Sequence, residues 1–354
     1  MRCRYCFYHA VSESRSVKNY GMMSIEILEQ LVKNALGYAE GYCCFAFQGG
    51  EPTLIGLDFY RQLIEFQKKY AQPGVKIENT IQTNGVLIDD EWARFLGENH
   101  FLAGLSLDGP RKINDCNRID ADNGGSFQNI MQTIDILRKR RVDFNILSVI
   151  TSPSAGSPDY LYRFYTKQGF DFLQFIPCLD DNRHAKPDYA LKTGQYGEFL
   201  SRMFTLWKTD FDGGRKTDIR FFSNLVQMAA GYAPEACGMS GHCTPYPVVE
   251  GDGSVYPCDF YVTDEWKLGD VYDDFTVMLG GEKAKMFSAP SQIINEKCRE
   301  CSCFMLCRGG CRRWREPIAD GVPAVNRLCE DYQIFFAHCA GGIIEMARKY
   351  LGGH

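Results

Sequence analysis

The sequence predicts an α/β protein, with a parallel sheet in its first part and a cysteine-rich second domain. Between about residues 24 and 215, apolar strands alternate with single amphipathic helices, which is the pattern of βα units. Nine of the 16 cysteines lie between 237 and 329, where long apolar elements are scarce. With 354 residues, 45% of them hydrophobic, the chain can form one large or two medium domains. We expect one domain over residues 1–215 and a second, ending in a helix, over 216–354.

The elements of the first domain follow from periodicity. Apolar residues recur at helical spacing over 24–39, and Ser24 is a suitable N-cap. Further helices are predicted at 57–70, 89–98, 126–141, 158–168 and 196–211. Strands are predicted at 42–48, 76–83, 101–107, 143–150 and 171–177, the first of them buried. Because single helices separate the strands, we expect a parallel sheet, either open or closed as a barrel.

The chain opens with "MRCRYCFYHA", so that Cys3 and Cys6 lie where most domains fray. A βα array should begin with a strand, but only this cysteine pair and a loop precede the first predicted helix. We therefore expect that the sequence begins one strand too late.

The second domain reads as short strand-like pieces rich in Gly, Pro and Cys. The segment "YPVVEGDGSVYP" at 246–257 predicts a hairpin, because Asp-Gly supplies the positive φ angles that such turns require. A domain with so few long apolar elements needs internal crosslinks, and its cysteines can supply them through a metal site.

The cysteine spacing predicts two four-thiolate sites. The segment "CRECSCFMLCRGGC" holds a C-x2-C-x5-C-x3-C pattern with Cys303 as an additional thiol inside it. Eight cysteines fill two sites, namely Cys237, Cys243, Cys258, Cys298, Cys301, Cys307, Cys311 and Cys329. Zinc and iron–sulfur clusters both use this spacing, so both stay open here. The other cysteines of apolar or isolated context are expected to be ordinary buried side chains: Cys43, Cys44, Cys116, Cys178 and Cys339.

Composition excludes several classes of function. A formal net charge of −5 argues against a general nucleic-acid or membrane-surface binder, which would need a basic face. No apolar run approaches the roughly 20 residues of a membrane span. The start carries no charged-then-apolar leader, so we expect a soluble, cytoplasmic protein.

The motifs resemble those of a known family. "CRYCFYHA", followed by a strand ending in "QGGEP", resembles the radical S-adenosylmethionine (SAM) enzymes, whose hallmark is C-x3-C-x2-C in a partial six-stranded βα barrel. The later cysteines resemble the SPASM extension of that superfamily, with its two auxiliary iron–sulfur clusters. "FQGGEPTL", "QTNG", "SLDGP", "CGMSGHC", "DGSVYPCDFY" and "GGCRR" further resemble the anaerobic sulfatase-maturating enzymes over nearly the whole chain.

This resemblance implies three 4Fe–4S clusters, the first of which binds SAM. Cys3 and Cys6 would ligate that cluster, whereas the family's first cysteine would fall upstream of Met1. The missing cysteine and the missing strand point to one gap, so we expect a truncated or mis-assigned start, with roughly 15–20 residues lost. As written, the first cluster lacks one ligand.

The resemblance also implies the SAM contacts. In the family the open iron chelates SAM, and one electron from the cluster cleaves it to a 5′-deoxyadenosyl radical. The matching positions here are Tyr5, Gly50, Ser106, Arg118 and Leu179. Glycine in "GGEP" lets the main chain approach the SAM amino group, and an arginine can pair with the SAM carboxylate.

By the same resemblance, the auxiliary clusters divide the eight later cysteines, and Cys303 is excluded. The first would take Cys237, Cys243, Cys258 and Cys311, and the second Cys298, Cys301, Cys307 and Cys329. Asp259 matches the family's catalytic base, which removes the proton while a peptidyl Cys or Ser is oxidised to Cα-formylglycine. Tyr8, Gln48 and Gln82 lie near strand ends and are candidate peptide contacts.

The implied partners are an unfolded sulfatase polypeptide with a Cys/Ser-x-Pro-x-Arg motif and a one-electron reductant such as flavodoxin or ferredoxin. No nucleic-acid or membrane partner is expected. Two alternatives remain at this point. Another SPASM peptide maturase would form a thioether or carbon–carbon crosslink, and a non-catalytic peptide-binding protein would use zinc as a structural crosslink. The choice between cysteine and serine, the individual sulfatase, the reductant and the oligomeric state do not follow from the sequence.

Overall fold

The computed structural model describes residues 1–354 except 121, 181–186, 353 and 354. The described residues form two compact units, which are interleaved along the chain. The first unit comprises Met1–Ser106, Arg118–Phe144 and Thr244–Phe287. The second comprises Leu107–Asn117, Asn145–Cys243 and Ser288–His354. The predicted division at residue 215 is a different partition and stays a prediction.

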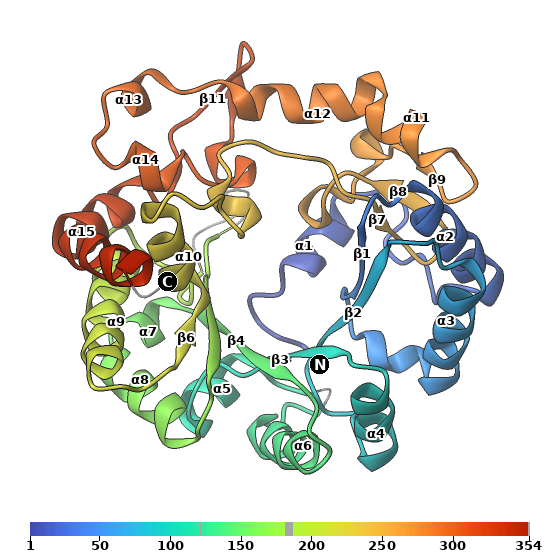
Figure 1. Ribbon diagram of the computed structural model, residues 1–354, viewed down its shortest axis with the longest axis horizontal. Coiled ribbons are helices and arrows are strands. Elements are labelled where there is room, and N and C mark those ends of the chain that lie inside the picture. The colour runs from blue at the N-terminus through green and yellow to red at the C-terminus, as the bar shows by residue number, and fades with distance from the viewer. Residues whose placement is uncertain (121, 181–186, 353–354) are drawn as a thin grey trace. The chain divides into compact units, whose positions relative to one another are not determined.

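The first unit contains three strands that pair in parallel in chain order, as the βα pattern predicts (Figure 1). These strands are β1 (Tyr42–Phe47), β2 (Lys76–Thr83) and β3 (Leu102–Ser106). Helix α3 (Leu57–Tyr70) connects β1 to β2, and α4 (Asp90–Glu98) connects β2 to β3. The other helices are α1 (Phe7–Glu13), α2 (Ile25–Tyr38), α6 (Phe127–Lys139), α11 (Phe275–Gly280) and α12 (Glu282–Gln292), whose last residues belong to the second unit.

Strand β1 corrects one expectation. The apolar segment at 42–48 was expected to be a buried strand, but of its residues only Phe45 is buried, at 7% exposure. Strand β1 pairs with β2 and, within the described residues, with no other strand, so it lies at a sheet edge. Cys44 is therefore exposed rather than buried.

The last segment of the first unit, Thr244–Phe287, contains a small antiparallel sheet. The predicted hairpin is confirmed: β7 (Val248–Val249) pairs with β8 (Ser254–Tyr256), and Gly253 supplies a φ of +88° in the turn. A third strand, β9 (Gly269–Asp270), pairs with β8. Val255 of β8 lies in a core with Phe275 of α11, and side chains of α2 pack against this core.

Helix α1 was not predicted, and it anchors the N-terminal cysteine pair. Val11 of α1 forms a buried cluster with Tyr256 and Val262, and Phe7 packs against it. The loop after α1 adds a hydrogen bond of 2.8 Å between the Tyr20 and Tyr256 hydroxyls. The first residues are thus tied to the β7–β8 hairpin.

The second unit contains β4 (Phe144–Ile150, from its second residue on), β5 (Phe172–Pro177) and β6 (Asp218–Ile219), again parallel. The two-residue strand β6 was not predicted, because it is too short for any period to show. The longer helices are α8 (Pro158–Lys167), α9 (Gln195–Asp212), α10 (Arg220–Ala229) and α15 (Cys329–Gly352). Shorter elements are α5 (Arg111–Asn117), α7 (Ser152–Ala155), α13 (Glu296–Arg299), α14 (Phe304–Cys307), β10 (Ile318–Ala319) and β11 (Val322–Pro323).

Helix α15 packs along α9 and fixes the position of Cys329 at its first turn (Figure 1). A Cβ at Gly197 would lie 2.4 Å from the Asp331 carbonyl oxygen, so only glycine permits this approach. The Gly197 amide donates to Asp331 Oδ1 at 2.9 Å. Phe222 of α10 stacks on Phe335 of α15 with ring centroids 5.8 Å apart.

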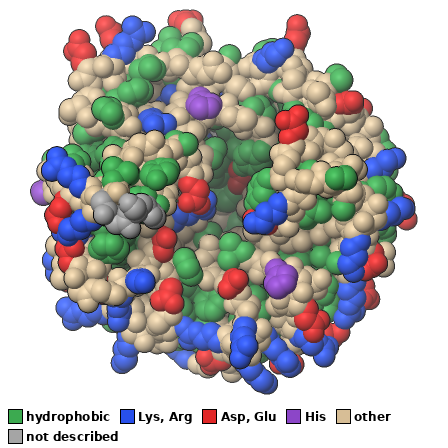
Figure 2. All heavy atoms as spheres, viewed as in Figure 1, with side chains coloured by type: hydrophobic (Ala, Val, Ile, Leu, Met, Phe, Trp, Pro, Cys, Tyr) green, Lys and Arg blue, Asp and Glu red, His purple; other side chains and the backbone are tan. Residues whose placement is uncertain are grey.

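Lys and Arg are interspersed with Asp and Glu over most of the face shown in Figure 2, and Lys and Arg are more frequent along its lower edge. Among the described residues, no helix is both long enough and apolar enough to cross a membrane.

Candidate functional site

Cys3 and Cys6 lie on one tight turn at the start of the first unit. The Cys6 amide donates to the Cys3 carbonyl at 3.1 Å, and Cys6 is the N-cap residue of α1. Cys3 is half-buried and Cys6 is exposed. The turn thus presents both thiols beside a helix that is packed on the hairpin, and it does not fray.

The structure brings Tyr5 and Arg118 together. The Arg118 guanidinium lies over the Tyr5 ring, 5.5 Å from its centroid, in a cation–π contact. Arg118 is 6% exposed. The amide of Arg2, which directly precedes Cys3, donates to the carbonyl of Ile119, the residue after Arg118, at 2.7 Å. A buried cation therefore lies next to the cysteine turn.

The "QGGEP" loop follows β1, and the backbone of its second glycine, Gly50, is not covered by other atoms. Gly50 has a φ of +48°, and a Cβ at this position would meet nothing within 4 Å. The backbone at Gly50 therefore borders open space. This is the environment in which a main chain can approach a ligand closely.

Glu51 holds this loop, a function that the sequence motif did not reveal. Its carboxylate accepts hydrogen bonds from the Thr53 amide at 3.2 Å, from the Thr53 and Thr83 hydroxyls at 2.6 Å each, and from the Asn84 amide at 2.8 Å. Glu51 thereby ties the end of β1 to the end of β2.

We expect Glu51→Gln to destabilise the protein by about 1–3 kcal/mol, because an amide nitrogen would face one of these donors. The urea unfolding midpoint of the anaerobically purified protein measures this effect. Glu65→Gln, at an exposed pair with Lys68 on α3, is the control and should shift stability by less than about 0.5 kcal/mol. Equal small shifts in both variants would contradict the assigned function of Glu51.

Two other predicted residues meet at neighbouring strand ends. Gln82 Nε2 of β2 donates to Ser106 Oγ of β3 at 3.1 Å.

Leu179, another predicted SAM contact, lies in the second unit, just after β5. Its neighbour Asp180 forms an ion pair with Arg327, two residues before Cys329.

Asp259 lies at the centre of a polar cluster in the first unit. Its Oδ1 accepts from the Tyr246 hydroxyl at 3.0 Å and from the Cys258 thiol at 3.3 Å. Its Oδ2 accepts from Gln48 Nε2 at 3.3 Å. The Tyr246 hydroxyl also lies 3.8 Å from Cys258 Sγ. The sequence analysis found Asp259, Gln48 and Cys258, but it assigned no function to Tyr246, the first residue of the predicted hairpin segment.

Tyr8 faces the same carboxylate. Burial raises the pKa of Tyr8, and the negative charge of Asp259 adds to the rise, whereas a hydrogen bond from the Gly49 backbone opposes it. Burial and the charges of Cys258 and Asp259 likewise raise the pKa of Tyr246. Both phenols are therefore neutral hydrogen-bond donors at physiological pH.

The second unit gathers the later cysteines into two groups. Burial, together with the nearby Cys329, Cys298 and Cys301, raises the pKa of the Cys307 thiol to about 11. Burial also raises the pKa of Cys311 to about 11, with contributions from Cys243 and Cys237. The resemblance assigns these cysteines to two ligand sets and adds Cys258, which lies in the first unit, and the sets stay predictions. Cys303 lies beside the first group, since it raises the pKa of Cys329 together with Cys298 and Cys301.

Within the described residues, no three His, Cys, Asp or Glu side chains converge tightly enough to hold a single metal ion. The choice between zinc and iron–sulfur therefore depends on the comparisons below. Of the remaining cysteines, Cys178 and Cys339 are buried as expected and Cys43 is half-buried. Cys116 is exposed, so the expectation of a buried side chain was wrong there as it was for Cys44.

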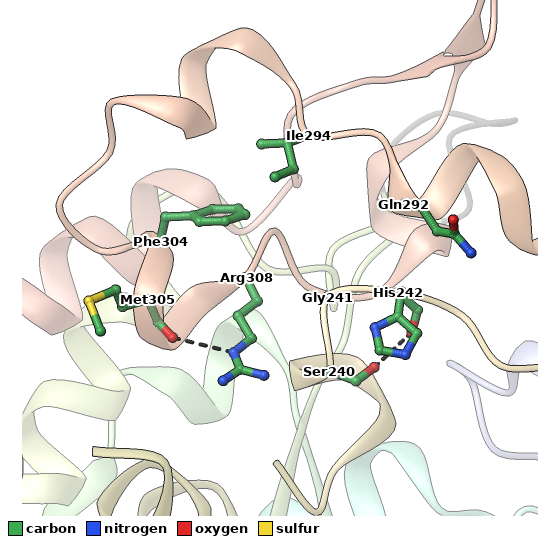
Figure 3. Close-up of a pocket in the computed structure, with 8 residues that line it drawn as sticks. All are labelled: Ser240, Gly241, His242, Gln292, Ile294, Phe304, Met305 and Arg308. Atoms are coloured by element: carbon green, nitrogen blue, oxygen red, sulfur yellow. Dashed lines mark hydrogen bonds between the residues drawn. The ribbon is translucent and has the colours of Figure 1, made fainter. Parts of the chain in front are cut away.

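A surface pocket of about 580 Å³ lies in the second unit where two cysteine-bearing loops meet (Figure 3). One wall carries Gly241 and His242, directly before Cys243, and the other carries Met305 and Arg308, on either side of Cys307. A Cβ at Gly241 would lie 3.0 Å from the Arg308 Cβ, so the two loops approach closely.

Comparisons with known proteins define the class. Residues 1–152 match the radical SAM superfamily, and residues 243–302 match the SPASM iron–sulfur cluster-binding domain. A cysteine-type anaerobic sulfatase-maturating enzyme of Clostridium perfringens strain 13 is 44% identical over 352 residues, covering 99% of this chain and 95% of that protein. A serine-type enzyme of Bacteroides thetaiotaomicron is 33% identical and covers 96% and 86%.

A solved structure described as native anSMEcpe with bound AdoMet and Cp18Cys peptide superposes with a TM-score of 0.93 at 42% identity, covering 99% of this chain and 96% of that one. These matches make the chain a radical SAM oxidoreductase with a SPASM iron–sulfur domain. Within that class, it belongs to the family of anaerobic sulfatase-maturating enzymes. The expectations about fold, enzyme class and iron–sulfur chemistry are thereby confirmed, and zinc is set aside.

Proposed function

We propose that this enzyme oxidises a peptidyl cysteine of a sulfatase to Cα-formylglycine, with Asp259 as the base. The observation that carries this proposal is the Asp259 carboxylate, which directly follows Cys258 and is held by Gln48 and Tyr246. Cysteine rather than serine is proposed because the cysteine-type relatives are 43–45% identical to this chain and the serine-type relatives 30–33%.

The residues of the first unit fit a SAM-binding cluster. Cys3 and Cys6 would ligate the iron from their shared turn. Gly50 would contact SAM through its open main chain, and Arg118 would offer a buried cation to the SAM carboxylate. Tyr5, Ser106 and Leu179 are the other proposed SAM contacts. When bound and reduced, this group supplies the abstraction of one hydrogen atom from the substrate Cβ.

Asp259 performs the proton step. Oxidation of the cysteine removes a hydrogen atom from Cβ, a proton from sulfur and one further electron, which leaves a thioaldehyde. A carboxylate oxygen of Asp259 takes the thiol proton. Hydrolysis of the thioaldehyde then releases sulfide and leaves the formyl group. Tyr246, a neutral donor, orients Asp259, while Tyr8, Gln48 and Gln82 are the proposed peptide contacts.

The later cysteines would hold two auxiliary 4Fe–4S clusters. One would take Cys298, Cys301, Cys307 and Cys329, all in the second unit. The other would take Cys237, Cys243, Cys311 and, from the first unit, Cys258. Clusters with complete thiolate ligation suit electron transfer, because no iron is open to substrate.

The proposed substrate is an unfolded sulfatase segment with a Cys-x-Pro-x-Arg motif. The electrons come from a one-electron carrier such as flavodoxin or ferredoxin. We place the enzyme in the cytoplasm, where thiols and low-potential clusters stay reduced. A SPASM maturase that forms crosslinks would share the clusters, but the relatives favour formylglycine formation. The non-catalytic alternative is set aside because the chain belongs to a family of enzymes.

The test uses anaerobically reconstituted enzyme, SAM, dithionite and two synthetic peptides that differ only in Cys or Ser at the target position. We expect formylglycine by mass spectrometry and 5′-deoxyadenosine in equal amounts, with the cysteine peptide converted faster. Three clusters correspond to about 12 irons per chain, and the two auxiliary clusters alone to about 8. A crosslinked product would overturn the proposal, and an iron-free protein would overturn the cluster assignments.

A further inference from the structure

A buried arginine lies among the cysteines of the second unit. Arg315 ends the short 3-10 helix Arg312–Arg315, four residues after Cys311, and it is 5% exposed. Among the residues that the structure describes, it forms no ion pair with a carboxylate. Its Nε is buried without a hydrogen-bond partner in that same part of the chain. An arginine in this setting is costly unless negative charge lies nearby.

The guanidinium is fixed in place rather than free to reach solvent. Arg315 Nη2 donates to the Ser291 carbonyl at 2.8 Å, and a Cβ at Gly309 would lie 3.4 Å from Arg315 Nη1. The Arg315 carbonyl accepts from the Ala324 amide at 2.8 Å, which holds the backbone. Ser291 is itself buried, and its hydroxyl accepts from the Cys243 amide at 2.8 Å. Ser291 thus contacts both Arg315 and Cys243, one of the proposed cluster ligands.

Cysteines of both proposed auxiliary sites lie close to Arg315. Burial lowers the pKa of Arg315, and four nearby cysteines oppose that effect through the negative charge that they carry when ionised: Cys243, Cys311, Cys298 and Cys307. Two of these belong to each four-cysteine set. The pocket in Figure 3 has the loop before Cys243 and the turn around Cys307 as its walls, so one cysteine of each set lies beside it within this unit.

We propose that Arg315 is a positioning residue that serves both auxiliary clusters as one fixed positive charge and raises their reduction potentials. This inference rests on the proposed cluster ligation. Four thiolates give an oxidised 4Fe–4S cluster a double negative charge, and reduction adds another. A buried cation nearby favours the reduced form, because the low dielectric of the interior strengthens the attraction. The charge also limits the repulsion between the two anionic clusters.

A purely structural function for Arg315 makes different predictions, and two substitutions separate them. Arg315→Gln removes the charge but keeps a donor for the Ser291 carbonyl. Arg315→Lys keeps the charge but loses the planar guanidinium. Arg299→Gln is the matched control, because it removes an equal charge next to Cys298 from an exposed position.

The experiment measures iron content and potentiometric EPR titrations in a Cys3→Ala/Cys6→Ala background, so that only the auxiliary clusters contribute. We expect Arg315→Gln to lower the midpoint potentials of both clusters at unchanged iron content. Arg315→Lys and Arg299→Gln should leave the potentials near those of the parent. If Arg315→Gln loses iron while Arg315→Lys retains it with parent potentials, the charge is needed and the proposal also stands.

Two results would overturn the inference: unchanged potentials in Arg315→Gln, or loss of iron from both Arg315 variants, which would indicate a structural function. A parent protein that binds no iron would instead refute the cluster assignments on which the inference rests. The two failures are therefore distinguishable by the iron content of the parent.

Discussion

Asp259→Asn is expected to lose most formylglycine formation, by a factor of about 10²–10⁴, which is the usual contribution of a positioned base. Asparagine keeps the size of the side chain and can still accept from Tyr246, whose hydroxyl lies 3.0 Å from Oδ1. It cannot take a proton at neutral pH. Iron content and SAM binding should be unchanged. The measurement is peptide conversion by mass spectrometry, with 5′-deoxyadenosine quantified in the same samples.

The ratio of 5′-deoxyadenosine to formylglycine shows which step the substitution affects. If Asp259 is the base, hydrogen abstraction can proceed while oxidation stalls, so 5′-deoxyadenosine should exceed formylglycine. Asp264→Asn is the control, because Asp264 lies on the same segment and accepts from exposed Ser16 groups at 2.8 and 3.0 Å. Unchanged turnover in Asp259→Asn would remove Asp259 from the mechanism.

The fold could be predicted where one period extends over a whole element. The predicted ranges 57–70 and 76–83 coincide with α3 and β2, and Ser24 caps α2 through the Ile27 amide. The elements that were missed are short or depend on distant contacts. Strand β6 has two residues, and α1 is held by Tyr256 and Val262, more than 200 residues away.

The candidate site shows the same limit. Residues inside recognisable motifs, such as Cys6, Gly50 and Asp259, could be named from the sequence. Tyr246 and Arg315 could not, because neither the hairpin segment that Tyr246 begins nor the spacing around Arg315 shows which side chains these two residues meet. Their meaning depends on what lies beside them after folding.

The anchoring of the first residues links the two chemical centres of the first unit. Cys6 caps α1, and α1 packs on the hairpin that leads into Cys258 and Asp259. Phe7 and Phe260 lie with ring centroids 4.8 Å apart. The loop after α1 adds an Arg15–Glu250 ion pair at 3.3 Å. A cysteine pair at the start of the chain is therefore positioned by the same core as the proposed base.

Cys307→Ala is the second substitution with a large expected effect, and it should remove about four irons per chain, the content of one 4Fe–4S cluster. Cys307 is the thiol around which Cys329, Cys298 and Cys301 gather, so its loss leaves three ligands. The electron acceptor would be impaired, and peptide conversion should fall with the iron content. Iron analysis and EPR of the reconstituted protein measure the effect.

Cys303→Ala is the control that decides between the ligand sets. On spacing alone Cys303 could replace a neighbour, and it lies close enough to raise the pKa of Cys329. The assignment from the resemblance excludes it, so Cys303→Ala should retain all its iron. Loss of iron from Cys303→Ala with retention in Cys307→Ala would exchange the two residues in the cluster. Loss of iron from both variants would indicate that Cys303 supports the cluster without being one of its ligands, since a 4Fe–4S cluster with four thiolates cannot take a fifth.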